Sequence, residues 1–105
     1  MIVDREVSAT RLIADVPEAW LDELRYVADE VETMVIAVDL SPVERFGTRE
    51  LNELLKLQGR LRQTGRKLVL ERPCERVREV FRLTRLDRVI EIIDSDGDPH
   101  RVLGL

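Results

Sequence analysis

Residues that carry catalytic or metal chemistry are scarce in this sequence. It holds one cysteine, Cys74, and one histidine, His100. A single cysteine excludes an intrachain disulfide, and one cysteine with one histidine falls short of the four ligands of a structural zinc site. A lone histidine near the C-terminus predicts no triad of nucleophile, histidine and buried carboxylate. We therefore expect no catalytic residue, no metal and no cofactor, and we interpret Cys74 as a small core side chain.

Glycine-rich motifs and long apolar runs are also missing. The five glycines, at positions 47, 59, 65, 97 and 104, form neither a GxGxxG nor a GxxxxGK pattern, which excludes the phosphate-binding loops of Rossmann and P-loop proteins. No stretch approaches the ~18 apolar residues of a transmembrane helix. Charges fall within the first six residues, which is unlike a signal peptide. We expect a cytoplasmic protein with no direct membrane insertion.

Neither sign of charge dominates the sequence. Charged residues make up 36% of the chain, the two signs are interspersed, and the formal net charge is −4. This pattern is typical of a globular surface, and an acidic chain lacks the basic face that a general nucleic-acid binder needs. The arginines between Arg76 and Arg88 are interleaved with acidic residues, so we interpret them as a mixed-sign surface. We predict a protein partner and no nucleic acid.

The acidic segment Asp94–Asp98 has the composition of a calcium loop but not its spacing. An EF-hand loop has glycine at its sixth position and glutamate at its twelfth. Counted from the first aspartate, these places hold Pro99 and Leu105. We interpret the segment as a polar turn, and the tail at 100–105 has too little pattern to assign.

Apolar, β-branched segments predict the strands. The segment Ile2–Ile13 separates β-branched residues by charges, which favours one or two short strands in a hairpin or at an edge, with the pairing left open. Met34–Leu40 is a nearly continuous apolar run, typical of a central strand buried on both faces. Lys67–Leu70 and Arg88–Ile93 are shorter runs of the same kind. We expect these segments to form one sheet.

Helical periodicity fills the intervals between these strands. Asp15 and Pro17 predict the start of a first helix, because a capping carboxylate and a proline both suit its first turn. The core side of this helix carries six apolar residues: Trp20, Leu21, Leu24, Val27, Ala28 and Val31. A second helix is predicted over Thr48–Thr64, with Thr48 as its N-cap and Gly65 as its stop.

The apolar stripe of the second helix is predicted from its spacing. It comprises Leu51, Leu54, Leu55, Gln58 and Leu61, with Leu57 at its margin. A third, short helix is expected from Pro73 to about Leu83, and it would bury Val77, Val80 and Phe81.

The order of these elements predicts the fold class. One or two strands are followed by three helix–strand pairs, and alternating strands and helices need crossovers of one hand, which give a mostly parallel sheet. We therefore expect a single α/β domain over residues 1–105. Its sheet would have four or five strands, a mixed N-terminal edge and helices packed on it.

The junction between the strand at 34–40 and the helix at 48–64 is the best candidate for a functional site. The carboxyl edge of a parallel sheet is where partners and ligands usually bind. A phosphate on Thr48 would lie against helix amides and the positive end of the helix dipole. An unmodified N-cap threonine explains the same position equally well.

The residues of this junction resemble those of the STAS family, the sulfate-transporter and anti-sigma factor antagonist domains. Asp39-Leu-Ser-Pro-Val43 matches the family's Asp-Leu-Ser-Gly-Val, and Gly47-Thr-Arg-Glu-Leu51 falls where the family has Asp-Ser-Ser/Thr-Gly-Leu. Gly65–Leu70 is similar to the strand that follows. Val77–Ile92 is similar to the closing helix and strand, including a Leu-Asp turn. The likeness is clearest over residues 35–94.

The resemblance implies a STAS-like fold and a role in partner switching. Family members of this kind bind a serine-kinase anti-sigma factor and free the sigma factor, and phosphorylation of a serine at the start of the second helix reverses this. By position, Thr48 takes the place of that serine. Gly47 replaces the family's acidic residue, Arg49 its second hydroxyl residue and Glu50 its glycine, so the phosphorylation motif is divergent.

The resemblance also predicts the surface that meets the partner. It comprises Asp39, Ser41, Pro42, Val43, Arg45, Phe46, Gly47, Thr48, Arg49 and Asn52. The expected partner is a kinase or anti-sigma factor of a bacterial regulatory pathway. The alternative is a constitutive accessory subunit of a lipid-transport ATPase or a sensory scaffold, with Thr48 as a contact that is never phosphorylated. A monomer and a weak dimer both remain open.

Overall fold

The computed structural model describes residues 2–5 and 9–93, and it confirms the α/β class. Five strands alternate with three α-helices and one short 3₁₀ helix. In chain order these are β1 (Ile2–Arg5), β2 (Ala9–Ile13), α1 (Trp20–Glu30), β3 (Val35–Asp39), α2 (Thr48–Gln63), β4 (Lys67–Glu71), α3 (Glu75–Thr84), η1 (Leu86–Arg88) and β5 (Glu91–Ile93). The predicted segment 94–98 and the tail at 100–105 lie outside the described residues.

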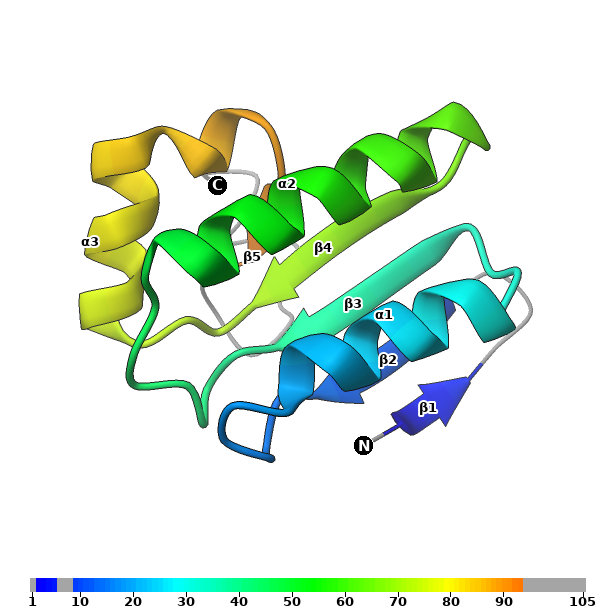
Figure 1. Cartoon of the computed structure of the whole chain (residues 1–105), viewed down its shortest axis with the longest axis horizontal. Helices are drawn as coiled ribbons and strands as arrows, with labels where there is room; N and C mark the ends of the chain where they lie inside the picture. Colours follow the sequence, from blue (N-terminus) through cyan, green and yellow to red (C-terminus); the bar gives the residue numbers. More distant parts are fainter. Residues whose placement is uncertain (1, 6–8, 94–105) are drawn as a thin grey trace, which may run out of the picture.

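The five strands form one sheet in the order β1-β2-β3-β4-β5. Strand β1 is antiparallel to β2, and the other neighbours are parallel, so the predicted mixed N-terminal edge is confirmed. Each crossover steps to the next strand in the same direction. Because crossovers have one hand, the helices lie on one face of the sheet, with α2 between α1 and α3 (Figure 1).

The core fills the space between this sheet and the helices. The strand residues that face the helices have no solvent exposure: Leu12, Ile36, Val38, Leu68 and Leu70. The six apolar residues predicted for the first helix, from Trp20 to Val31, are all buried as well. Aliphatic side chains thus form most of the core, and Phe81 is the largest fully buried side chain in it.

The predicted start of the first helix and the predicted N-cap of the second were wrong, and the structure shows why. Helix α1 begins at Trp20, not at Pro17, because Glu18 has a φ of 66°, in the left-handed region that a helix cannot include. Helix α2 has Gly47 as its N-cap, and Thr48 makes no capping bond. The Oε1 atom of Glu50 instead accepts the Gly47 amide at 2.7 Å, which satisfies one of the free amides at this end.

Three smaller corrections concern the second half of the chain. On α2 the burial of two leucines is the reverse of the prediction: Leu57 is buried, and Leu55 is 36% exposed. Helix α3 begins at Glu75, after Cys74 as N-cap, rather than at Pro73, and Val80 on it is only half-buried. The last strand is shorter than predicted because η1 occupies Leu86–Arg88, so β5 starts at Glu91.

The polar member of the α2 stripe, Gln58, links three elements. Its Nε2 donates to the Val89 carbonyl at 3.0 Å, and its Oε1 accepts the Leu68 amide at 3.0 Å. The side chain is only 6% exposed, so both bonds are made away from water, where an unpaired amide would be unfavourable. Gln58 therefore joins α2 to the start of β4 and to the turn before β5.

Arg66 caps the carboxyl end of α1 from a distant part of the chain. Its three guanidinium nitrogens donate to the carbonyls of Ala28, Val31 and Thr33, at 3.3, 2.7 and 2.8 Å. Helix α1 has no basic residue in its own last turn, so Arg66 supplies the positive charge that the dipole favours there. Gly65, with a φ of 73°, makes the turn that places Arg66.

Replacing Arg66 by methionine tests this cap. We expect Arg66→Met to lower the free energy of unfolding by about 2 kcal/mol, because three carbonyls lose a charged donor. Urea unfolding followed by circular dichroism measures the change. The control is Arg62→Met, since Arg62 is exposed and its side chain makes no hydrogen bond among the described residues; it should change stability by less than about 0.5 kcal/mol. Equal effects of the two variants would contradict the capping role.

Candidate partner-binding site

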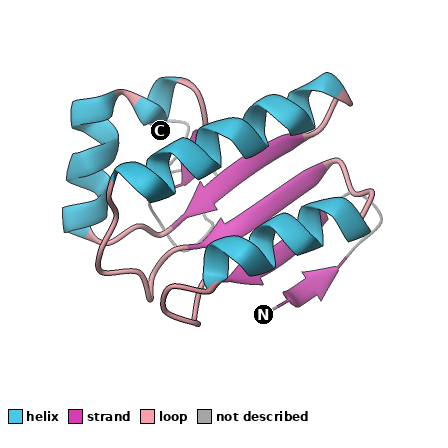
Figure 2. Cartoon of the chain, in the orientation of Figure 1, coloured by secondary structure: helices cyan, strands magenta, loops and turns pink. Residues whose placement is uncertain are grey.

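The loops that follow β2, β3 and β4 lie at one edge of the sheet (Figure 2). This follows from the topology, because the carboxyl ends of parallel strands meet at the same edge. The longest of the three, here called the β3–α2 loop, runs from Leu40 to Gly47 and contains most of the residues predicted to bind a partner. The sequence prediction therefore points to a single place in the structure.

Apolar side chains hold the β3–α2 loop against the core. Leu40 is fully buried, and Val43 and Phe46 are 6% and 9% exposed. The ring of Phe46 packs edge-on against Phe81 of α3, with 5.0 Å between the ring centroids and an angle of 87° between the planes. Val43 and Phe46, both predicted partner contacts, thus point inward and fix the shape of the loop.

The outward residues of the loop and of the α2 N-terminus form the accessible surface. Seven of the ten predicted contact residues are exposed: Ser41, Pro42, Arg45, Gly47, Thr48, Arg49 and Asn52. Thr48 is the first residue of α2, and its hydroxyl makes no hydrogen bond among the described residues. A partner or a modifying enzyme can therefore approach Thr48 from solvent.

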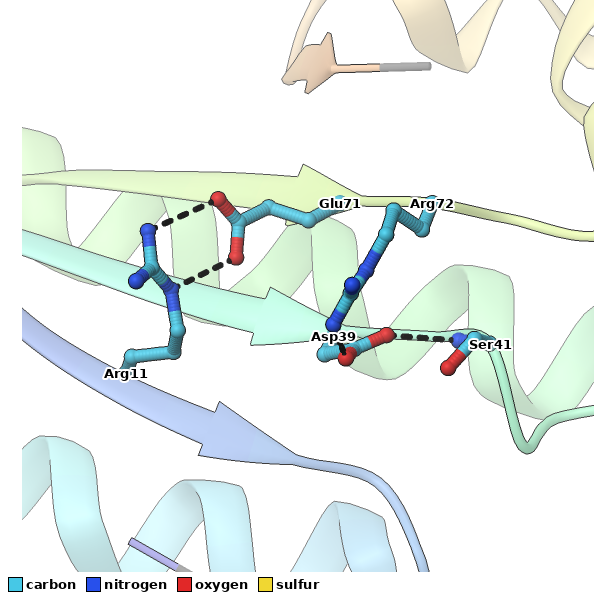
Figure 3. Close-up of polar contacts among 5 residues, drawn as sticks. All are labelled: Arg11, Asp39, Ser41, Glu71 and Arg72. Atoms are coloured by element: carbon cyan, nitrogen blue, oxygen red, sulfur yellow. Dashed lines mark hydrogen bonds and ion pairs between the residues drawn. The ribbon is translucent and has the colours of Figure 1, made fainter. Parts of the chain in front are cut away.

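Asp39, the third inward member of the predicted set, is a buried carboxylate at the end of β3. It is 2% exposed, its Oδ1 accepts the Ser41 amide at 2.9 Å, and its Oδ2 pairs with Nη2 of Arg72 (Figure 3). Arg72 follows β4 and has a φ of 51°. Asp39 thereby joins the start of the β3–α2 loop to the connection between β4 and α3.

The environment of Asp39 keeps it ionised. Burial alone would raise the pKa of Asp39. Hydrogen bonds from the Ser41 amide and hydroxyl and from Arg72, together with the positive charge of Arg72, outweigh burial and lower the pKa below its ordinary value. The charged form is the one that holds Ser41 and Arg72 in place.

A second buried carboxylate lies beside Asp39. Glu71 is opposite Asp39 in the register of β3 and β4, and it is 6% exposed. Arg11 of β2 reaches across β3 and binds Glu71 through two bonds of 2.9 and 3.1 Å (Figure 3). Two neighbouring carboxylates would repel each other, and each has its own arginine. The pairs lie on the sheet face away from the helices, since the alternate strand residues face the core.

Sequence reasoning missed Arg11, Glu71 and Arg72. A signal was available, because Asp39 and Glu71 each end an otherwise apolar strand, and a buried carboxylate there needs a cation. Which arginine pairs with each carboxylate depends on the strand register, which the sequence alone does not give.

A hollow of about 480 Å³ adjoins the β3–α2 loop. One wall comes from that loop and the start of α2, and the other comes from the connection between β2 and α1. Its lining contains Ala14, Asp15, Pro17, Glu18, Trp20, Leu21, Pro42, Val43, Glu44, Arg45, Arg49 and Glu50. The first six of these were not predicted as site residues, although their place after β2 put them at the same sheet edge.

The hollow has a mixed rim and no sign of metal chemistry. Four carboxylates and two arginines line it. No cluster of three or more histidine, cysteine, aspartate or glutamate residues suited to a metal ion occurs in residues 2–5 and 9–93. Over the same residues, no helix has both the length and the apolar character to span a membrane. Cys74 is partly buried against the core, and its Sγ contacts the Val43 carbonyl at 3.5 Å.

The Asp39 interaction makes a prediction about pH. Because its pKa is lower in the folded state, Asp39 stabilises the fold above its ordinary pKa, and this contribution is lost as the pH falls through the folded value. We expect Asp39→Asn to lower the free energy of unfolding by about 1–2 kcal/mol at pH 7. The difference from the unmodified protein should shrink as the pH falls below the ordinary pKa of aspartate and through the lower pKa of the folded state.

Urea unfolding at a series of pH values measures this difference. The control is Asp87→Asn, since Asp87 is an exposed aspartate of η1, and it should shift stability by less than about 0.5 kcal/mol at pH 7. A stability difference for Asp39→Asn that stays constant from neutral to acid pH would contradict the proposed charge pairing.

Comparisons with known proteins agree with this architecture. A protein called TM1081, solved by NMR, superposes with a TM-score of 0.74 and 25% sequence identity, over 90% of this chain and 79% of that one. No curated protein matches significantly. The model of a family described as "Mlab, STAS domain" matches residues 9–93, which is most of the chain. The chain therefore belongs to the STAS domain family, a family of protein-interaction modules.

Proposed function

We propose that this domain is a regulator of the anti-sigma factor antagonist type, which acts in the cytoplasm by binding a kinase or anti-sigma partner and does no chemistry of its own. The observation that carries the proposal is that the residues of the β3–α2 loop divide into a buried set and an exposed set. Inward residues fix its backbone, while Ser41, Pro42 and Arg45 project outward beside an open hollow. A rigid, exposed loop of this kind binds with little loss of conformational freedom.

The hollow supports a contact that includes both of its walls. Arg45 and Arg49 are exposed and make no ion pair among the described residues, so a partner's carboxylates can bind them without breaking an existing pair. Glu18 and Glu44 on the same rim are likewise exposed and unpaired within residues 9–93. A mixed rim of this kind favours a partner whose charges alternate in the complementary order.

Thr48 is the proposed switch within this surface. A phosphate there would add a charge of about −1.5 to −2 next to Arg49 and the positive end of α2. The Glu50 carboxylate already binds the Gly47 amide at this end, so phosphate and carboxylate would compete for the same positive region. Phosphorylation would therefore change both the charge of the rim and the start of α2, which supports release of a bound partner.

The bond between Glu50 and Gly47 also favours a second candidate function. It stabilises α2 with an acidic side chain where other family members have glycine, and so supplies negative charge without modification. On this reading the domain is a constitutive accessory subunit of a lipid-transport ATPase or a sensory scaffold. The same surface would bind the partner, and Thr48 would be an ordinary contact.

Charge reversal on the loop tests the binding surface. A partner captured from the native host by the full chain is identified first, and its affinity for each variant is then measured by calorimetry. We expect Arg45→Glu and Arg49→Glu each to weaken binding at least about tenfold. Arg62→Glu makes the same charge change on the opposite end of α2 and should leave binding unchanged. Equal affinity of all three variants would contradict the proposed surface.

The two candidate functions differ at Thr48. Thr48→Asp should weaken binding and Thr48→Ala should preserve it if phosphorylation is the switch. Incubation with the captured kinase, ATP and Mg²⁺ should then add one phosphate at Thr48, located by mass spectrometry. If both Thr48 variants bind like the unmodified protein while Arg45→Glu does not, the constitutive subunit is the correct function.

A further inference from the structure

Charge is distributed unevenly between the two ends of the molecule. Residues 15–34 contain seven carboxylates and one arginine, and residues 72–88 contain six arginines and three carboxylates. The first segment includes α1 and the second includes α3 and η1. Since α2 lies between α1 and α3 (Figure 1), the two helices that carry most of these charges lie on opposite sides of α2.

The acidic end exposes an aromatic side chain. Tyr26 is 65% exposed, on a helix whose other side packs on the core. Glu30 is four residues further along α1, so the two side chains share a face of the helix. Neither makes a hydrogen bond or ion pair among the described residues. We call Tyr26 and Glu30 the α1 outer face.

The basic end exposes two aliphatic side chains. Leu83, at the end of α3, is 75% exposed, and Val89, just after η1, is 46% exposed. Arg85 precedes η1, with a φ of 61°, and Arg88 is the last residue of η1. Both are exposed and have no ion pair within residues 9–93. We call Leu83, Arg85, Arg88 and Val89 the α3–η1 corner.

We propose that a second copy of this chain binds here, with the α1 outer face of one copy on the α3–η1 corner of the next. The unpaired Glu30 carboxylate of one copy would meet the unpaired guanidinium groups of Arg85 and Arg88, which outnumber the exposed Asp87 carboxylate between them, and the Tyr26 ring would meet exposed aliphatic side chains. Aromatic residues and arginine are enriched in protein interfaces. The two surfaces carry opposite charge and lie on different parts of the chain. Each surface therefore meets its complement only on another copy.

The geometry of this contact determines the kind of assembly. The two surfaces differ and lie at opposite ends of the helical layer, so the contact is heterologous and head-to-tail. Contacts of this kind extend into short chains or close into a ring, and do not stop at a two-fold dimer. The surfaces are small and charged, so the association is weak and salt-dependent. Neither surface includes the β3–α2 loop, and the inference does not rest on the proposed function.

Sedimentation of the full chain tests the inference. In about 20 mM salt the weight-average mass should rise above 12.2 kDa as the protein concentration increases. About 300 mM salt should lower the association constant roughly tenfold. Glu30→Arg and Arg88→Glu should each lower it about tenfold in low salt, and the chain with both changes should recover it. Leu83→Ser should weaken association without altering the thermal unfolding midpoint.

The matched control is Arg62→Glu, which makes the same reversal on an exposed arginine outside both surfaces and should leave the association constant unchanged. A mass of 12.2 kDa at every concentration in low salt overturns the inference. Association that is unaffected by Glu30→Arg and Arg88→Glu also overturns it. So does failure of the double variant to recover, since the two ends would then not face each other.

Discussion

The candidate site depends on one buried charge, the carboxylate of Asp39 at the carboxyl end of the central strand. Such a group is unfavourable in the interior unless it is fully paired, and here its two oxygens are bound by Ser41 and Arg72. Through these bonds it fixes the first turn of the β3–α2 loop and ties that loop to the segment before α3. The apolar side chains further along the loop, Val43 and Phe46, hold the rest of it against the core.

The topology explains how this buried carboxylate can position loops at the surface. Parallel strands place three successive loops at one edge, and the right-handed crossovers place the helices on one face. Asp39 and Glu71 end neighbouring strands on the opposite face, where no described helix covers them and arginine side chains can reach both. The structure thus separates an apolar layer that provides stability from a polar layer that positions the loops.

Much of the fold could be predicted from the sequence, because apolar periodicity reports burial directly. The continuous run at 34–40 indicated a central strand, and the spacing from Trp20 to Val31 gave the core side of α1 correctly. The start of α1 was harder to predict, since the left-handed φ of Glu18 is a backbone property that this residue type does not signal. The loop residues were harder still. Without a regular period, nothing in the order of Ser41, Val43 and Phe46 showed which would point inward.

The packing of Phe46 against Phe81 has an evolutionary consequence. Because Val43 and this aromatic pair pack the β3–α2 loop against the core, the two exposed residues between Val43 and Phe46, Glu44 and Arg45, contribute little to folding. Substitutions at positions 44 and 45 would therefore change the surface of the loop while its backbone keeps the same course. Under the proposed function, duplicated genes that encode this domain could therefore diverge in partner choice without compensating changes in the core.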